Sequence, residues 1–529
     1  MVNKISKNKI NIIILISILV LAFLLRVQYL DKPLQRDEPL FFEAAENLNE
    51  KKNPIFCEMC VDEHGKTLKI FNYHPPLFLS YLSIIIQVFS LNETVLRFLI
   101  VVFSISTIFL TYLIGYETGG KKLGFVAAFL LAINRLHIEH SQIIDIDGSF
   151  FTFFIILNIL LFIKWFKSNN KKYLILSIIA LTGSLLTKES AVLIFIPLFF
   201  YLFKKRKTDK FLEIASVTIS LSLIFIFLFN FYFSVNIFEG VLNQLNRITA
   251  EKTIESRLTR LYQFSGIVTW EFTPPFILIS LYSIFYNWKK KNQYFIFLIY
   301  VTVLFVFFYT LIFGITRYFV PIIPILCLLI SSYILERRGG IKNIAFILII
   351  AFLCFSGFYY LKIRTDINFL NNIKTNFTLI TIPYVLCLVP ITLYFTKYRS
   401  LALITLIGMT IGYNLYFGQE AINPLVTPDY NKAVIDAAEF IKNSSIESPV
   451  ITTHDIALYS NREYYDVEGP LMNVKSIDTL TKENKANYII YKTNTVVIQP
   501  SVDEFLESSC KKVKSGISNN VEVFKVFQC

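Results

Sequence analysis

Long apolar runs separated by short polar stretches repeat along most of the chain. A membrane-spanning helix needs roughly 20 mostly apolar residues, and about thirteen runs before residue 418 fit that description. They are 10–30, 94–116, 123–140, 149–166, 172–187, 190–203, 211–233, 267–287, 294–314, 319–335, 342–360, 377–396 and 400–417. The pattern predicts an α-helical polytopic membrane protein with about 13 transmembrane helices.

A shorter apolar run, 76–91, decides the topology. Short loops rich in Lys and Arg mark the cytoplasmic side of a membrane protein. If the N-terminus is cytoplasmic and 76–91 does not cross, every basic loop lies inside, whereas a crossing at 76–91 would place them all outside. These loops hold Lys121-Lys122, Lys164 to Lys172, Lys204 to Lys207, Lys289 to Lys291, Arg337-Arg338 and Lys397 to Arg399. We therefore expect 76–91 to be an interfacial or re-entrant helix within a first outer loop, 31–93.

The chain changes character from residue 418 onward. Asp429–Lys442 has the periodicity of an amphipathic helix, and Val450–Thr453, Tyr488–Tyr491 and Val521–Phe527 have that of strands. We predict two domains: a transmembrane domain, 1–417, and a small extracytoplasmic α/β domain, 418–529. The first apolar run lacks a small-residue cleavage site, so we interpret it as a retained span rather than a signal peptide.

Composition agrees with this picture. Hydrophobic residues make up 54% of the 529 residues, and the mean hydropathy is +0.56. A soluble protein of this length could not bury so much apolar surface. The net charge of +13 lies in short clusters between apolar runs. We interpret these clusters as topology signals in a multi-pass cell-membrane protein, and not as nucleic-acid contacts.

Ionisable residues gather at the predicted outer ends of the spans, where charge is costly and usually functional. Each has an ordinary structural alternative: carboxylates can cap a following helix, and basic side chains can extend to the interface. Their ordered recurrence on one face favours a functional site. The candidates are Asp37, Glu38, His74, Arg97, Asp145, Asp147, Lys188, Arg317 and Tyr318.

The order of these motifs resembles the polyprenyl-phosphate-dependent glycosyltransferases of the GT-C fold, with protein O-mannosyltransferases and lipid A aminoarabinose transferases as the nearest groups. The resemblance rests on the following elements: Arg36-Asp37-Glu38, His74-Pro75-Pro76-Leu77, Glu93 to Arg97, Asp147 before a span, Lys188 and Arg317-Tyr318. It covers nearly the whole chain. An extra carboxylate, Asp145, leaves open which aspartate of that turn has the family role.

The resemblance implies that one sugar moves from a polyprenyl (dolichyl or undecaprenyl) phosphate to a protein, lipid or glycan hydroxyl outside the cytoplasm, with inversion. Asp37 would be the general base beside Glu38, because a partly shielded carboxylate has a raised proton affinity. Arg317, Lys188 and His74 would stabilise the departing phosphate. Asp145 and Asp147 would orient the acceptor.

Several alternatives stay open. Glu38 and Asp147 are also candidate ligands for a divalent cation, with a metal-free reaction as the alternative. The absence of a Trp-Trp-Asp motif argues against transfer of a whole oligosaccharide to asparagine. A transporter or lipid flippase is the rival function, although transporters carry charges near the midplane and often show internal repeats, and neither feature is found.

The cysteines outside the spans form two candidate pairs. Cys57 and Cys60 lie in the first outer loop, where a disulfide persists; a zinc site with His64 and free thiols are the alternatives. Cys510 and Cys529 lie in the predicted outer domain and are the second candidate disulfide.

The topology predicts that a reporter fused after residue 120 stays in the cytoplasm, because only then do all basic loops lie inside. A paired alkaline phosphatase and fluorescent-protein fusion reads the side directly. Phosphatase activity at that position would show that 76–91 crosses the membrane, and would move the candidate site away from the outer face.

Overall fold

The computed structural model describes residues 2–28, 30, 34, 37–61, 67–71, 74–89, 92–233, 237, 274–312, 316–336, 405–411, 430–443, 450–452, 464–466, 488–492, 500–518 and 521–528. Contacts divide the chain into two units. The helical unit comprises Met1–Tyr29, Arg97–Phe227 and Gln244–Pro424, and the mixed unit comprises Leu30–Leu96, Leu228–Asn243 and Leu425–Cys529.

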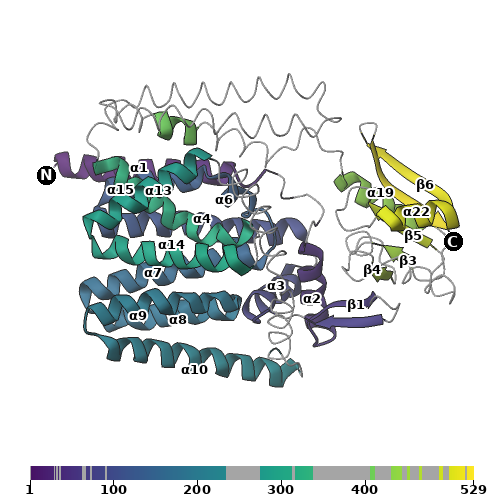
Figure 1. Ribbon diagram of the computed structural model, residues 1–529, viewed down its shortest axis with the longest axis horizontal. Helices are drawn as coiled ribbons and strands as arrows, with labels where there is room; N and C mark the ends of the chain where they lie inside the picture. Colours follow the sequence, from purple (N-terminus) through teal and green to yellow (C-terminus); the bar gives the residue numbers. More distant parts are fainter. Residues whose placement is uncertain are drawn as a thin grey trace. The chain divides into compact units, whose positions relative to one another are not determined.

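Helices joined by short turns make up the described part of the helical unit, and Figure 1 shows its longer helices running side by side. The elements are α1 (Val2–Leu24), α4 (Glu93–Gly119), α5 (Lys121–Ala132), α6 (Arg135–Glu139), η1 (Ile146–Phe150), α7 (Phe151–Ser168), α8 (Lys171–Thr187), η2 (Glu189–Ile194), α9 (Phe195–Lys204), α10 (Thr208–Phe233), α13 (Pro274–Lys290), α14 (Gln293–Ile312), η3 (Thr316–Ile322) and α15 (Ile323–Glu336). One large apolar core joins most of them.

Several described helices have the length and apolarity of membrane spans. They are Glu93–Gly119, Ile146–Ser168, Thr208–Phe233, Gln293–Thr310 and Arg317–Glu336. Their length and apolarity agree with the predicted helical membrane fold. The count of about 13 stays a prediction, because the spans expected at 342–360 and 377–396 lie outside the described residues.

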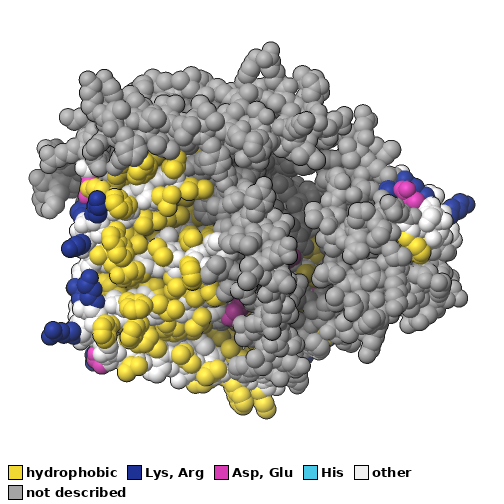
Figure 2. Space-filling view, viewed as in Figure 1, with side chains coloured by type: hydrophobic (Ala, Val, Ile, Leu, Met, Phe, Trp, Pro, Cys, Tyr) yellow, Lys and Arg dark blue, Asp and Glu magenta, His cyan; other side chains and the backbone are white. Residues whose placement is uncertain are grey.

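Basic side chains lie together at one end of the helical unit. Lys121 begins α5, Lys167 lies in the last turn of α7, and Lys204 ends α9. Figure 2 shows Lys and Arg side chains along one edge of a broad apolar face. Since α7 and α8 are antiparallel neighbours, residues 146–150 and 188 lie at the opposite end of this helix pair.

Close helix contacts depend on two glycines. A Cβ added at Gly115 of α4 would lie 2.6 Å from the Cα of Gly124 in α5, and a Cβ at Gly124 would lie 2.5 Å from the carbonyl oxygen of Tyr112. Both clashes are with backbone atoms, which cannot swing aside. The absence of side chains at these two positions therefore sets how closely α4 and α5 approach each other.

A buried arginine ties the end of α1 to the neighbouring helices. Arg26 is fully buried and donates to Ser104 Oγ at 2.9 Å and to the carbonyl oxygens of Ala132 and Ala22 at 2.8 and 3.0 Å. Its guanidinium also lies 2.9 Å from His137 Nδ1. Hydrogen bonds to carbonyl oxygens offset the cost of burying this charge.

The mixed unit combines the first loop with the tail. Its loop part holds α2 (Glu38–Glu50), β1 (Ile55–Val61), β2 (Thr67–Phe71) and α3 (Leu77–Phe89), and its tail part holds α19 (Tyr430–Asn443), β3 (Val450–Thr452), β4 (Tyr464–Asp466), β5 (Tyr488–Lys492), α22 (Pro500–Ser509), β6 (Lys511–Ser518) and β7 (Val521–Gln528). The helix α3 has 13 residues, or about 20 Å at 1.5 Å per residue, which is too short to cross the hydrocarbon core.

The described strands form one seven-stranded sheet with the order β2-β1-β4-β3-β5-β7-β6. The three central strands β4, β3 and β5 are parallel, and β6 and β7 add an antiparallel hairpin. The apolar face of α19 packs on the sheet through Ala437, Ala438 and Ile441. The helix and the three strands predicted for the tail are thus confirmed within about two residues, whereas β1 and β2 of the first loop were not expected.

Replacing Gly124 with alanine should destabilise the helical unit, although alanine favours a helix. The new Cβ meets a backbone oxygen, and overpacking of this kind costs about 1–3 kcal/mol. Thermal unfolding of the detergent-purified protein measures the loss. Gly119→Ala is the matched control, since its Cβ meets only the Leu123 side chain; equal unfolding temperatures for both variants would contradict the close approach of α4 and α5.

Candidate active site

Three of the described helices begin with an irregular turn at the end opposite the basic loops. A π-helical turn, η1, precedes α7, and the 3-10 turns η2 and η3 precede α9 and α15. Gly148 departs from helical geometry inside η1, with φ −80° and ψ −128°, and Pro321 lies inside η3. Turns of the 3-10 type are common at helix ends, whereas π-type turns occur frequently at functional sites. Here, each of them carries or adjoins one of the predicted charged residues.

Asp147 of η1 lies between two cations from the other two turns. Lys188, which precedes η2, forms an ion pair with Asp147 Oδ1, and the Nε of Arg317 from η3 lies 3.3 Å from Oδ2. The side chains of Asp147 and Lys188 are 4% and 3% exposed, whereas that of Arg317 is 26% exposed. The carboxylate therefore fixes two cations while one of them stays open to solvent or ligand.

Tyr318 extends this cluster with an aromatic ring. The Lys188 Nζ lies 3.9 Å from the centroid of the Tyr318 ring, within cation–π range. Tyr309 of α14 stacks on the same ring at 5.1 Å with an interplanar angle of 19°, and its hydroxyl donates to Ser190 Oγ. The position of the lysine is thus defined by a carboxylate and a ring rather than by either alone.

Asp145 has a different role from Asp147. Its Oδ1 accepts a hydrogen bond of 2.6 Å from the Gly148 amide and caps η1, and its Oδ2 lies 3.3 Å from His140 Nδ1. Burial opposes ionisation, but the His140 hydrogen bond, the His140 and Arg317 charges and the Gly148 amide lower the pKa of Asp145 below its usual value. The capping alternative holds for Asp145, which leaves Asp147 as the carboxylate that contacts the cations.

Asp37, Glu38 and His74 belong to the mixed unit. Asp37 occupies the N-cap position of α2 without a side-chain capping hydrogen bond, so its carboxylate can stabilise this helix only through its charge. Glu38 is 1% exposed. The His74 ring lies 6.3 Å from that of Phe41, which packs on Phe78 of α3 at 5.5 Å. Arg36 lies outside the described residues.

The structure brings together Asp145, Asp147, Lys188, Arg317 and Tyr318 of the predicted set. Arg97 is 2% exposed in α4. Sequence reasoning did not select Tyr309 and Ser190, because a tyrosine in an apolar run and a serine after a charged pair carry no distinctive signal.

The described residues test the metal and disulfide predictions only in part. No cluster of three or more His, Cys, Asp or Glu side chains occurs within the described part of the chain, and a metal on Asp147 would compete with Lys188 and Arg317. Cys510 is disulfide-bonded, while Cys529 lies outside the described residues. The side chains of Cys57 and Cys60 lie outside them too, so that pairing stays a prediction.

Asp147→Asn should destabilise the protein by about 3–5 kcal/mol, because it leaves the buried Lys188 without its carboxylate. Unfolding of the purified protein measures this loss. The exposed pair Glu117 and Lys167, 3.2 Å apart, supplies the control: Glu117→Gln should cost less than about 1 kcal/mol. In the double variant Asp147→Asn/Lys188→Gln, part of the stability should return. Equal losses for Asp147→Asn and Glu117→Gln would contradict the buried pair.

Comparisons with known proteins show what the chain is similar to. Residues 73–233 match the family model of dolichyl-phosphate-mannose-protein mannosyltransferases. These residues include Asp147 and Lys188 of the cluster. No curated protein sequence matches the chain.

Solved structures with the same fold cover nearly the whole chain. The oligosaccharyltransferase AglB from Archaeoglobus fulgidus, in complex with an inhibitory peptide and a dolichol-phosphate, matches with a TM-score of 0.58 at 11% identity, over 92% of this chain and 70% of that one. ArnT from Cupriavidus metallidurans, bound to undecaprenyl phosphate, matches with a TM-score of 0.56 at 12% identity, over 97% of both chains. The chain therefore has the GT-C fold of these membrane glycosyltransferases, and its residues 73–233 carry the sequence pattern of the dolichyl-phosphate-mannose-protein mannosyltransferase family.

Proposed function

We propose that the protein transfers a single sugar from a polyprenyl phosphate to an acceptor hydroxyl on the extracytoplasmic side of the membrane. The observation that carries this proposal is the buried Asp147, which holds Lys188 and Arg317 at the ends of apolar helices. Two fixed cations at the membrane face suit a ligand that combines a phosphate with a long apolar tail.

The proteins with the same fold support the choice of donor. Undecaprenyl phosphate is bound in the ArnT structure and dolichol-phosphate in the AglB structure, and the matching family is named for dolichyl-phosphate-mannose. Mannose, glucose, galactose and aminoarabinose are the candidate sugars. The acceptor is a protein, a lipid or a glycan. The missing Trp-Trp-Asp motif favours transfer of one sugar over that of a whole oligosaccharide.

Arg317 and Lys188 are proposed to stabilise the departing phosphate. As the bond between the anomeric carbon and the phosphate oxygen breaks, negative charge grows on that oxygen. Cations already held in place stabilise this charge without reorganisation. Arg317 is the more exposed of the two, so its guanidinium is the better candidate for direct contact, while Lys188 lies deeper between Asp147 and Tyr318.

Asp37 is proposed as the general base, with Glu38 beside it. The acceptor oxygen forms a bond to the anomeric carbon, its proton passes to the Asp37 carboxylate, and the polyprenyl phosphate leaves with the electron pair of the broken bond. Attack opposite the leaving group inverts the anomeric configuration. Asp37 lies at the N-cap of α2, and Glu38 is the first residue of that helix, so the two carboxyl groups are neighbours in the chain.

Asp37→Asn should lower transfer by about 10²–10⁴-fold by removing the base, and Arg317→Gln by about 10²–10³-fold by removing phosphate stabilisation. The assay uses purified protein, radiolabelled sugars on undecaprenyl and dolichyl phosphate, and membranes of the native cell as the acceptor source. Glu50→Gln on the exposed end of α2 is the control with full activity.

Two outcomes would contradict the proposal. If Asp37→Asn retains more than a few per cent of the activity of the unaltered protein, Asp37 is not the base. If no labelled sugar is transferred from any donor, but the protein reconstituted in proteoliposomes moves the intact donor across the bilayer, the protein is a transporter instead.

A further inference from the structure

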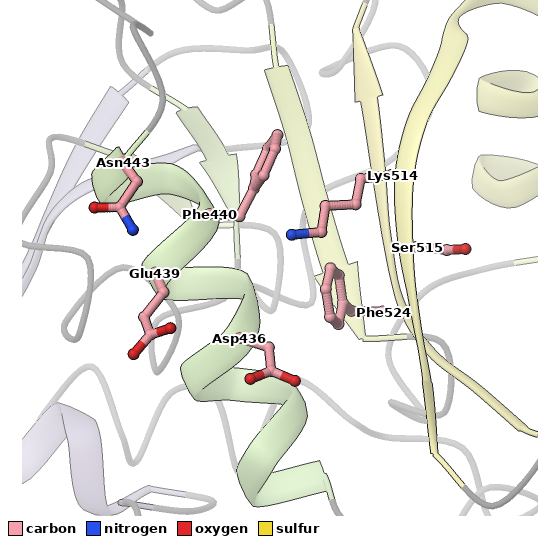
Figure 3. Close-up of a pocket in the computed structure, with 7 residues that line it drawn as sticks. All are labelled: Asp436, Glu439, Phe440, Asn443, Lys514, Ser515 and Phe524. Carbon is pink, nitrogen blue, oxygen red and sulfur yellow. The ribbon is translucent and has the colours of Figure 1, made fainter.

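A cleft in the mixed unit is lined by none of the residues assigned above. It has a volume of about 460 Å³, within the range of roughly 300–1,000 Å³ found for small-ligand sites. It opens between α19 and the hairpin of β6 and β7 (Figure 3). Its wall includes Asp436, Glu439, Phe440, Asn443, Lys514 and Phe524.

The charged side chains of this cleft are exposed and, among the described residues, are not held in ion pairs. Asp436, Glu439 and Lys514 are exposed, and no ion pair joins any of them to another side chain within the described residues. By contrast, Lys525 on the adjacent strand pairs with Glu507 at 2.9 Å. The hydrogen-bonding capacity of the cleft residues is therefore available to a ligand.

The mixture of charges disfavours an ionic ligand. A phosphate or carboxylate would face the two carboxylates of Asp436 and Glu439, and like charges repel. An organic cation would compete with Lys514, whose Nζ already lies 4.7 Å from the centroid of the Phe440 ring. A neutral ligand with many hydroxyls avoids both conflicts, because a hydroxyl donates to a carboxylate and accepts from an ammonium or amide group.

Two aromatic rings add an apolar surface to these polar groups. Phe524 is 1% exposed and lines the cleft, and Phe440 is half-buried on α19. Figure 3 shows the Lys514 side chain extending toward α19, with the Phe440 ring above its tip and the Phe524 ring below it. The C–H face of a sugar ring packs on an aromatic ring by dispersion while its hydroxyls bond to the surrounding polar groups.

We propose that this cleft binds a neutral saccharide through Phe440, Asp436 and Lys514. The site stands independently of the transfer reaction, because none of its residues belongs to the proposed catalytic set. If the protein transfers sugars as proposed, the cleft would hold a neutral glycan through residues that take no part in the transfer.

The test measures binding to the full-length protein in lipid nanodiscs, without any lipid-linked donor. Mannotriose, maltotriose and galactobiose are the neutral probes, trigalacturonate is the anionic probe, and a glucosamine disaccharide is the cationic probe. Saturation-transfer NMR and calorimetry should detect at least one neutral probe with a dissociation constant of about 1 mM or below, and weaker or no binding of the charged probes.

Substitutions locate the binding in the cleft. Asp436→Asn and Phe440→Leu should each weaken binding of the neutral probe about tenfold, equivalent to a shift of one decade in the dissociation constant. Lys514→Gln should also weaken it, whereas Lys442→Gln on the same helix as Phe440 should not, since Lys442 does not line the cleft. Unfolding curves show whether each variant is folded. Because Asp436 is exposed, Asp436→Asn should fold normally and still test the cleft if Phe440→Leu destabilises the domain.

The proposal is overturned if no neutral probe binds at concentrations up to about 10 mM, ten times the expected dissociation constant. It is equally overturned if a charged probe binds more tightly than every neutral one, or if Asp436→Asn and Lys514→Gln bind like the unaltered protein. None of these outcomes depends on transfer activity. The catalytic proposal is therefore tested separately, by the transfer assay.

Discussion

The buried pairing of Asp147 with Lys188 and Arg317 constrains the architecture of the helical unit. An ion removed from water costs several kcal/mol unless it is paired with good geometry. Asp147 and Lys188 are nearly inaccessible, so the three helix starts that carry these residues must stay in register for the charges to be paired. The same requirement holds two cations at these helix starts, and Arg317 is the more exposed of the two.

The irregular turns explain how regular helices present these side chains. An uninterrupted α-helix through 146–168 would orient Asp147 by the same 3.6-residue repeat as the apolar residues that follow. The non-helical Gly148 and the cap from Asp145 break that repeat at the charged residue. A Cβ at Gly148 would lie 2.9 Å from the His140 carbonyl oxygen, so the turn closes only around a glycine. Pro321 has a similar effect in η3, because it cannot donate a backbone hydrogen bond.

The sequence predicts much of this arrangement because the lipid bilayer restricts where charge can lie. Asp147, Lys188 and Arg317 are recognisable since each interrupts a long apolar run, and their common side follows from the basic loops. The sequence does not predict that Asp145 caps η1 while Asp147 pairs with the cations, because this depends on which carboxylate reaches the Gly148 amide. Likewise, Tyr309 and Ser190 meet across 119 residues of chain, and no local pattern marks such a contact.

The sequence does not predict that the first loop and the tail share one sheet. This sheet affects how the proposed base, Asp37, is positioned. The strand β1 of the first loop pairs with β4 of the tail through Cys60 and Asp466. The helix α2 is tied to β1 by the hydrogen bond from Asn47 Nδ2 to the Ile55 carbonyl oxygen and to α3 by the two hydrogen bonds between Asn49 and Ser83.

Strand pairing between segments some 400 residues apart leaves no periodic signal in either segment, since each strand shows only its own alternation. Asp37, at the start of α2, is therefore held by the same sheet that carries the proposed saccharide cleft. The tail accordingly belongs to the scaffold that positions the proposed base and is more than an appendage. In this fold, a change in the tail can alter the first loop without touching a transmembrane helix.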